Sequence, residues 1–275
     1  MDFKTALTCA NFSQDIYRIN FSKPESFAGE GLLPASAQLL QDEDTDTQFV
    51  ILDTDAAETV IVFRGSENDR DWDINLQIGQ KEQEWVKKAK KEAKKAFRKE
   101  MKEVAETVVE EEALVYPEEY GEPSRPVKMH QGFIGAYLSV RDRIHQYVEG
   151  SSSRRYRITG HSLGGAIATL CAVDLQYNFG REISIEAYTF GSPRVGNGAF
   201  TDSYNQRVPD TWRVVHGWDA VVGLPVPWQG YRHVDTAVKL ARDFTWKIIT
   251  GSFNDHKIGS YISALEKQID KQLER

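Results

Sequence analysis

Strand-like and helix-like segments alternate along the second half of this chain, and their order restricts the fold more than any other feature. Segments rich in β-branched and aromatic residues, typical of strands, cover 155–159, 183–190 and 211–216. Segments with a helical spacing of apolar residues cover 134–147, 163–177 and 198–204. Strands that alternate with helices in this way build parallel sheets. The sequence therefore predicts an α/β fold with a mostly parallel central sheet flanked by helices.

The amino-terminal part predicts one helix followed by three strands. The helix carries Phe3, Leu7 and Ala10 on one stripe, which Gln14 and Tyr17 can extend. The strands are expected at 35–41, 48–52 and 59–63. Only a short Asp-Thr-Asp turn at 53–55 separates the last two, so they should pair antiparallel. With a further helix expected at about 257–271 and no internal repeats, the 275 residues predict a single domain over 1–275.

Composition excludes several classes of protein. The net charge is −7 and the isoelectric point is near 5.5, so we expect no nucleic-acid partner. Cys9 and Cys171 are the only cysteines, too few for a disulfide framework or an all-cysteine zinc site. No apolar run approaches the ~18 residues of a membrane-spanning helix, and residues 1–20 do not resemble a signal peptide. These features favour a cytoplasmic protein, at most peripheral to a membrane.

A highly charged segment at 81–112 stands apart from the rest of the chain. It contains ten basic and nine acidic residues and lacks both glycine and proline. Its apolar residues, among them Trp85, Ala89 and Phe97, recur at three- and four-residue steps, which predicts a long amphipathic helix within an insertion of about 80–126. The lysines suit peripheral contact with an anionic membrane surface. The alternative is a solvated helix that packs one face on the domain.

The run Gly160-His161-Ser162-Leu163-Gly164 follows a predicted strand and opens a predicted helix. A serine on a sharp strand-to-helix turn exposes its hydroxyl, and flanking glycines relieve crowding around the turn. The N–H of Leu163, at the helix start, can bind a developing oxyanion. A phosphate-binding glycine turn is the alternative, but no G-x-G-x-x-G pattern is present. We therefore expect Ser162 to be a nucleophile.

Five stretches in order along the chain resemble the class 3 lipase family, the fungal-type triacylglycerol lipases and their plant and bacterial relatives. They are VFRGSENDRDWDINL at 62–76, VKMHQGFIGAY at 127–137, GHSLGGA at 160–166, YTFGSPRVGNGAF at 188–200 and RVVHGWDAVVGLP at 213–225. The resemblance implies the α/β-hydrolase fold. It also places the charged segment at 81–112 where this family carries a lid, although the usual lid helix is shorter and less rich in lysine.

The resemblance further implies a catalytic aspartate and histidine. Asp219 occupies the family's aspartate position, although turns favour aspartate in any case. The α/β-hydrolase order of serine, acid and histidine excludes His130, His145 and His161 as the base, and His216 is expected to pack at a strand end. His256 matches the family's catalytic histidine and His233 a non-catalytic one, so the resemblance favours His256 while leaving His233 as the alternative.

An oxyanion hole is implied at Ser66 and Leu163. Ser66 follows Arg64-Gly65 at the end of a strand and would contribute its backbone N–H, with its hydroxyl as a further candidate donor, and Leu163 would supply the second N–H. Capping of a helix amino terminus is the other role open to Ser66. Four matching positions are expected to serve as scaffold: Arg64, Asp71, Trp72 and His130.

These implications predict a serine hydrolase that cleaves carboxylic esters of lipids through Ser162, Asp219 and His256. The reaction passes through an acyl-enzyme intermediate and needs no metal and no organic cofactor. Acylglycerols are the favoured substrates. A phospholipase A1 or a galactolipase is the closest alternative, because the triad acts on the ester and does not read the remainder of the lipid. A catalytically inactive hydrolase-fold binding module is the alternative from another class.

Overall fold

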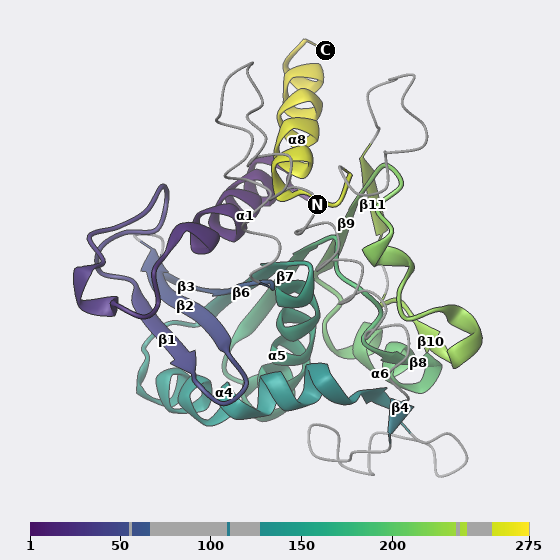
Figure 1. Ribbon diagram of the computed structural model, residues 1–275, viewed down its shortest axis with the longest axis horizontal. Helices are drawn as coiled ribbons and strands as arrows, with labels where there is room; N and C mark the ends of the chain where they lie inside the picture. The colour runs from purple at the N-terminus through teal and green to yellow at the C-terminus, as the bar shows by residue number, and fades with distance from the viewer. Residues whose placement is uncertain (55–56, 67–108, 111–126, 235–236, 241–254, 275) are drawn as a thin grey trace, which may run out of the picture.

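The computed structural model describes residues 1–54, 57–66, 109–110, 127–234, 237–240 and 255–274 (Figure 1). Within these residues a seven-stranded sheet has the order β1-β2-β3-β6-β7-β9-β11. Its strands are β1 Gln38–Asp42, β2 Thr47–Thr54, β3 Glu58–Phe63, β6 Arg155–His161, β7 Ser184–Phe190, β9 Thr211–His216 and β11 Ala237–Leu240. β2 pairs antiparallel with β1 and β3, and every later neighbour is parallel. The predicted mostly parallel sheet is confirmed.

Helices cover both faces of this sheet (Figure 1). They are α1 Phe3–Asp15, α4 Gln131–Gly150, α5 Leu163–Phe179, α6 Gly198–Arg207 and α8 Ile258–Leu273. Alternate side chains of β3 point to opposite faces of the sheet and contact different helices. Ile61 and Phe63 pack with the residues of α4 and α5, whereas Val60 and Val62 pack with Phe12 of α1 on the opposite face. A strand buried on both faces reads as a continuous apolar run, and β3 does so from Val60 to Phe63.

The two helices at the ends of the described chain lie side by side. α1 packs against α8, and together they share an apolar cluster with Phe190 of β7 and Val214 of β9 (Figure 1). The stripe predicted for α1 was too narrow, since Ala6 and Cys9 are buried whereas Leu7 is only partly so. The reason is that α1 contacts both the sheet and α8. This packing brings the start of α8 to the carboxyl ends of the central strands.

A second, small sheet corrects one sequence prediction. It has the order β10-β8-β5-β4, with β4 Val109–Glu110, β5 Met129–His130, β8 Gly196–Asn197 and β10 Tyr231–Arg232. The helix predicted over 81–112 is therefore wrong at Val109 and Glu110, which form a strand. The β-branched Val109 instead pairs with His130, where a sheet edge supplies hydrogen bonds that outweigh helical propensity. Residues 81–108, and nearly all of the insertion at 80–126, lie outside the described residues.

Element boundaries differ modestly from those predicted. The first strand begins at Gln38 and not at residue 35, because the Ala37 N–H donates to the Pro34 carbonyl in a turn. β11 was not predicted. A single domain over 1–275 stays a prediction. No helix in the described part of the chain has both the length and the apolar character to cross a membrane.

Candidate active site

Ser162 forms the sharp turn between β6 and α5. Its φ of 57° and ψ of −127° are costly for a residue other than glycine. Its N–H donates to the Phe190 carbonyl oxygen of β7 at 2.9 Å. Two glycines permit this turn: a Cβ on Gly160 would lie 2.3 Å from the Gly164 carbonyl oxygen, and one on Gly164 would lie 2.3 Å from that of Phe63. The strained turn places Ser162 at the carboxyl ends of the parallel strands, as in a nucleophile elbow.

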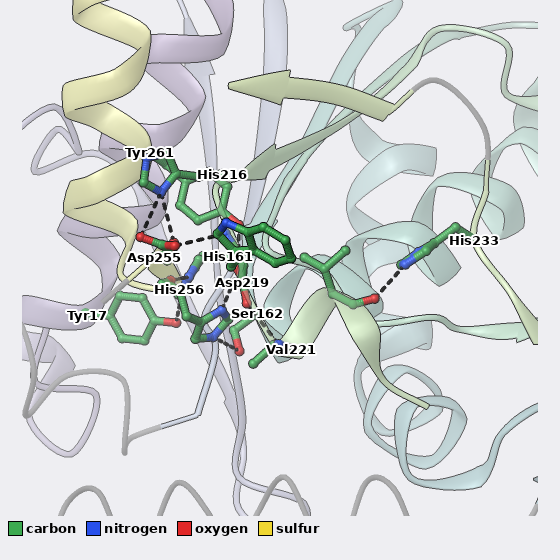
Figure 2. A network of polar contacts seen from close by, with 12 residues as sticks. Tyr17, His161, Ser162, His216, Asp219, Val221, His233, Asp255, His256 and Tyr261 are labelled. Atoms are coloured by element: carbon green, nitrogen blue, oxygen red, sulfur yellow. Dashed lines mark hydrogen bonds and ion pairs between the residues drawn. The ribbon is translucent and has the colours of Figure 1, made fainter. Parts of the chain in front are cut away.

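The structure brings three of the predicted site residues together (Figure 2). His256 Nε2 lies 2.9 Å from Ser162 Oγ, and His256 Nδ1 lies 2.8 Å from Asp219 Oδ2. All three side chains are buried. A carboxylate can only accept, so Nδ1 carries the ring proton and donates it to Asp219. That tautomer leaves the lone pair of Nε2 facing the serine hydroxyl, which is the arrangement a general base needs.

Asp219 is held by hydrogen bonds on both carboxylate oxygens. The Tyr261 hydroxyl donates to Oδ2 at 2.5 Å, and the Val221 N–H donates to Oδ1 at 2.9 Å. Burial alone would raise the pKa of Asp219, but the charge of His256 and the hydrogen bonds from His256 and Tyr261 hold that pKa below its usual value. The carboxylate is therefore ionised at neutral pH and can stabilise a cationic imidazole.

The segment that carries His256 is tied to the loop that carries Asp219. Asp255 Oδ2 accepts the Trp218 N–H at 2.9 Å, and the Asp255 carbonyl accepts from His216 Nδ1 at 3.3 Å. Gly217 has a φ of 52°, and a Cβ there would lie 2.5 Å from Asp255 Oδ2. Asp255, which directly precedes His256, is thus hydrogen-bonded to the end of β9 and the residues after it. His216, expected only to pack at a strand end, takes part in this attachment.

His233, the alternative base, does not reach Ser162. Its Nε2 lies 2.7 Å from the Val222 carbonyl oxygen, to which it donates, and Figure 2 shows His233 lying apart from Ser162, Asp219 and His256. Burial, with the charge of Arg213, lowers the pKa of His233 to about 3. A neutral imidazole that is already committed to a backbone carbonyl is a structural residue. The geometry therefore favours His256 as the base.

The predicted oxyanion donors lie at the start of α5 and just after β3, the two elements that meet at this turn. Leu163 is the first residue of α5, where N–H groups have no partner within the helix. The end of β3 contacts the same turn, since a Cβ on Gly164 would lie 2.9 Å from the carbonyl carbon of Arg64, and Ser66 follows two residues later, half-buried. The structure thus brings the strand that leads to Ser66 against the serine turn. The oxyanion roles of Ser66 and Leu163 stay predictions.

The residues expected to serve as scaffold are placed only in part. The Arg64 guanidinium donates to the Gln48 side chain and lies 6.0 Å from the centre of the Tyr17 ring. The His130 ring stacks on that of Phe133 at 4.0 Å. Asp71 and Trp72 lie outside the described residues. In the described ranges, no three His, Cys, Asp or Glu side chains form a group that could hold a metal ion.

A family comparison assigns this chain. The model of the family described as lipase (class 3) matches residues 60–228, more than half of the 275 residues. The chain belongs to the class 3 lipase family. This match spans the serine turn and the Asp219 loop, whereas His256 lies beyond it. The resemblance seen in the sequence is therefore confirmed at the level of the family.

Two relatives named as lipases show how far the likeness extends along the chain. A secreted mono- and diacylglycerol lipase of Fusarium solani is 30% identical over 189 residues, which cover 67% of this chain and 44% of that protein. A lipase of Caenorhabditis elegans is 43% identical over 102 residues, which cover 34% of this chain and 29% of that protein. This chain thus spans less than half the length of either relative.

A solved structure supports the fold of this chain. The triacylglyceride lipase of Rhizomucor miehei matches it with a TM-score of 0.60 at 24% identity, covering 86% of this chain and 79% of that one. At that identity the likeness shows a shared α/β-hydrolase fold. The predicted fold class is confirmed.

Sequence reasoning missed four residues that hold the site together: Tyr17, His161, Asp255 and Tyr261. His161 was considered only as a base and excluded for its position next to Ser162. Tyr261 follows His256 by five residues on the next helix, a spacing that could have suggested contact with the same site. Tyr17 and Asp255 carry no local signal, because their partners lie 144 and 37 residues away along the chain.

Proposed function

We propose that this chain is a serine hydrolase that cleaves carboxylic esters of lipids. One observation carries the proposal: Ser162 Oγ lies 2.9 Å from His256 Nε2, while His256 Nδ1 lies 2.8 Å from an ionised Asp219. A serine hydroxyl is a weak nucleophile unless an adjacent base accepts its proton, and the base works best when a third group orients it. The arrangement satisfies both requirements inside a buried site.

The reaction follows from the tautomer of His256. As Ser162 Oγ attacks the acyl carbonyl carbon, its proton passes to Nε2, and the imidazolium is stabilised by Asp219. Collapse of the tetrahedral intermediate breaks the ester bond, and Nε2 returns the proton to the leaving alcohol. Water, deprotonated by the same nitrogen, then attacks the acyl-enzyme and releases the carboxylic acid. Serine and imidazole recover their initial states.

The oxyanion of each tetrahedral intermediate needs donors in fixed positions. We assign this role to the backbone N–H groups of Leu163 and Ser66. The first residues of a helix present unsatisfied N–H groups together with the positive end of the helix dipole, which suits Leu163. Removal of one oxyanion donor typically costs about 10²–10³ in turnover.

A fluorophosphonate probe tests this function directly. Serine attacks its phosphorus only when a base activates the hydroxyl, and fluoride leaves. We expect covalent labelling of the native protein at Ser162, located by mass spectrometry of the labelled peptide, and no labelling after heat denaturation. A native protein that stays unlabelled would instead support the inactive binding module.

Acylglycerols are the substrates we propose, since the Fusarium relative is named a mono- and diacylglycerol lipase. Phospholipase A1 and galactolipase activities remain the alternatives, because the triad binds the ester alone. Release of fatty acid from diacylglycerol, phosphatidylcholine and monogalactosyldiacylglycerol in separate assays distinguishes the three. The cytoplasmic location expected from the sequence stays a prediction, and the name of the Fusarium relative as a secreted lipase weighs against it.

We also propose peripheral contact with anionic membranes through the lysine-rich part of the segment 81–108. Each lysine near such a surface contributes up to ~1 kcal/mol. Replacing Lys90, Lys91, Lys94 and Lys95 by glutamine should therefore weaken binding to phosphatidylserine vesicles by up to about 10³-fold in sedimentation. Binding to phosphatidylcholine vesicles should stay the same. Equal binding of the variant and the parent protein to phosphatidylserine would contradict this role.

A further inference from the structure

His161 connects the nucleophile's strand to the backbone of the proposed base. It is the last residue of β6, directly before Ser162, and is 1% exposed. Its Nε2 lies 2.7 Å from the His256 carbonyl oxygen, and its Nδ1 lies 3.0 Å from the Tyr17 hydroxyl (Figure 2). The His161 and His256 rings lie 4.7 Å apart. Both nitrogens of this buried ring are therefore engaged.

The chemistry of the partners fixes the direction of both hydrogen bonds. A carbonyl oxygen can only accept, so Nε2 of His161 carries the proton and donates it to His256. Burial and the neighbouring charge of His256 lower the pKa of His161 to about 3, so its ring is neutral at neutral pH. In a neutral ring the other nitrogen is an acceptor. The Tyr17 hydroxyl therefore donates to Nδ1, and this bond favours the tautomer that can hold His256.

The position of His256 makes such a bond useful. The residue lies just before α8, which starts at Ile258, and its imidazole must stay within hydrogen-bond distance of Ser162 Oγ. Asp255 fastens this segment to the end of β9, on the Asp219 side. His161 fastens it to β6, on the Ser162 side. A displacement of about 1 Å between reacting groups can cost ~10²-fold in rate, so two attachments that fix this distance affect turnover.

We propose that His161 and Tyr17 are positioning residues, which hold the His256 backbone so that its imidazole stays aligned with Ser162. The proposal rests on the proposed serine-hydrolase function. Neither side chain receives the transferred proton or touches the acyl group. A neutral His161 has a second benefit: it adds no positive charge beside His256 when that imidazole becomes cationic during the reaction.

Tyr17→Phe tests the proposal with the least disturbance. The substitution removes the hydroxyl that donates to His161 but keeps the ring on which the Arg64 guanidinium lies. We expect kcat for a short p-nitrophenyl ester to fall about tenfold with KM unchanged, and the rate of fluorophosphonate labelling to fall by the same factor.

Tyr156→Phe is the matched control. Tyr156 lies on β6 as His161 does, is 1% exposed, and its hydroxyl makes no hydrogen bond among the described residues. The kcat of Tyr156→Phe should stay within about twofold of the parent value. If Tyr17→Phe also stays within twofold in both kcat and labelling rate, the positioning role is wrong. A parent protein that neither labels nor hydrolyses esters would instead refute the proposed function.

Two substitutions of His161 separate positioning from packing. His161→Gln places an amide donor near the position of Nε2, whereas His161→Leu fills similar space without a donor. We expect kcat to fall about 10²-fold in His161→Leu and only about tenfold in His161→Gln, with little change in KM. Equal losses in the two variants would show a packing role and overturn the proposal. If His161→Leu fails to fold, the comparison of Tyr17→Phe with Tyr156→Phe decides.

Discussion

Ser162→Ala is expected to lower kcat for a short p-nitrophenyl ester by on the order of 10⁶. The substitution removes the only atom that can form the acyl-enzyme in the proposed mechanism, while the oxyanion donors and the neighbouring glycines keep their places. Loss of the nucleophile alone typically costs about as much as loss of the whole triad, since its members act as a unit. The measurement is steady-state hydrolysis by purified protein, with fluorophosphonate labelling of the same sample.

Ser203→Ala provides the matched control for that experiment. Ser203 lies on α6, is also buried, and its hydroxyl makes no hydrogen bond within the described part of the chain. Ser203→Ala makes the same chemical change as Ser162→Ala but outside the proposed triad. The kcat of this variant should therefore stay within about twofold of the parent value. More than about one per cent of the parent activity in Ser162→Ala would place the nucleophile elsewhere.

The central sheet could be predicted because its signals are local. β3 carries apolar side chains on both faces, β6 alternates Tyr156 and Ile158 with polar residues, and the helices between strands keep a helical period, so each element is visible in its own residues. β11 was missed for the opposite reason. Its four residues include the exposed Lys239, and it exists only through pairing with β9. Such short edge strands depend on tertiary contacts more than on their own composition.

The same distinction applies to the site. Ser162 was found from neighbouring residues, because the strain of the turn demands glycine beside it. Asp219 and His256 were found only through a family resemblance, since the two side chains that meet at 2.8 Å are 37 residues apart. Tyr261 and Tyr17 were missed as hydrogen-bond donors because both are fully or almost fully buried and look like ordinary core aromatics in the sequence.

Asp219→Asn is expected to lower kcat by about 10⁴ with little change in KM. Two physical effects combine. An asparagine that turns its amide N–H₂ toward His256 Nδ1 favours the tautomer with the proton on Nε2, which cannot accept a proton from Ser162. An asparagine that turns its oxygen toward Nδ1 keeps the tautomer but lacks the negative charge that stabilises the imidazolium. Either orientation lowers the rate of the chemical step and leaves substrate binding largely intact.

The pH dependence of the parent protein separates the role of Asp219 from that of other groups. The pKa of Asp219 in the folded protein lies below the ordinary value of 3.8. The stability of the fold that the Asp219 charge contributes is therefore fully present above pH 3.8 and is lost as the pH falls through the folded pKa. Any fall of kcat/KM between pH 8 and pH 5 therefore reports a group other than Asp219. Asp142→Asn is the control for Asp219→Asn, because it makes the same change at an exposed position of α4. It should leave the dependence of kcat/KM on pH unchanged. If Asp219→Asn stays within tenfold of the parent kcat, this carboxylate does not orient the base.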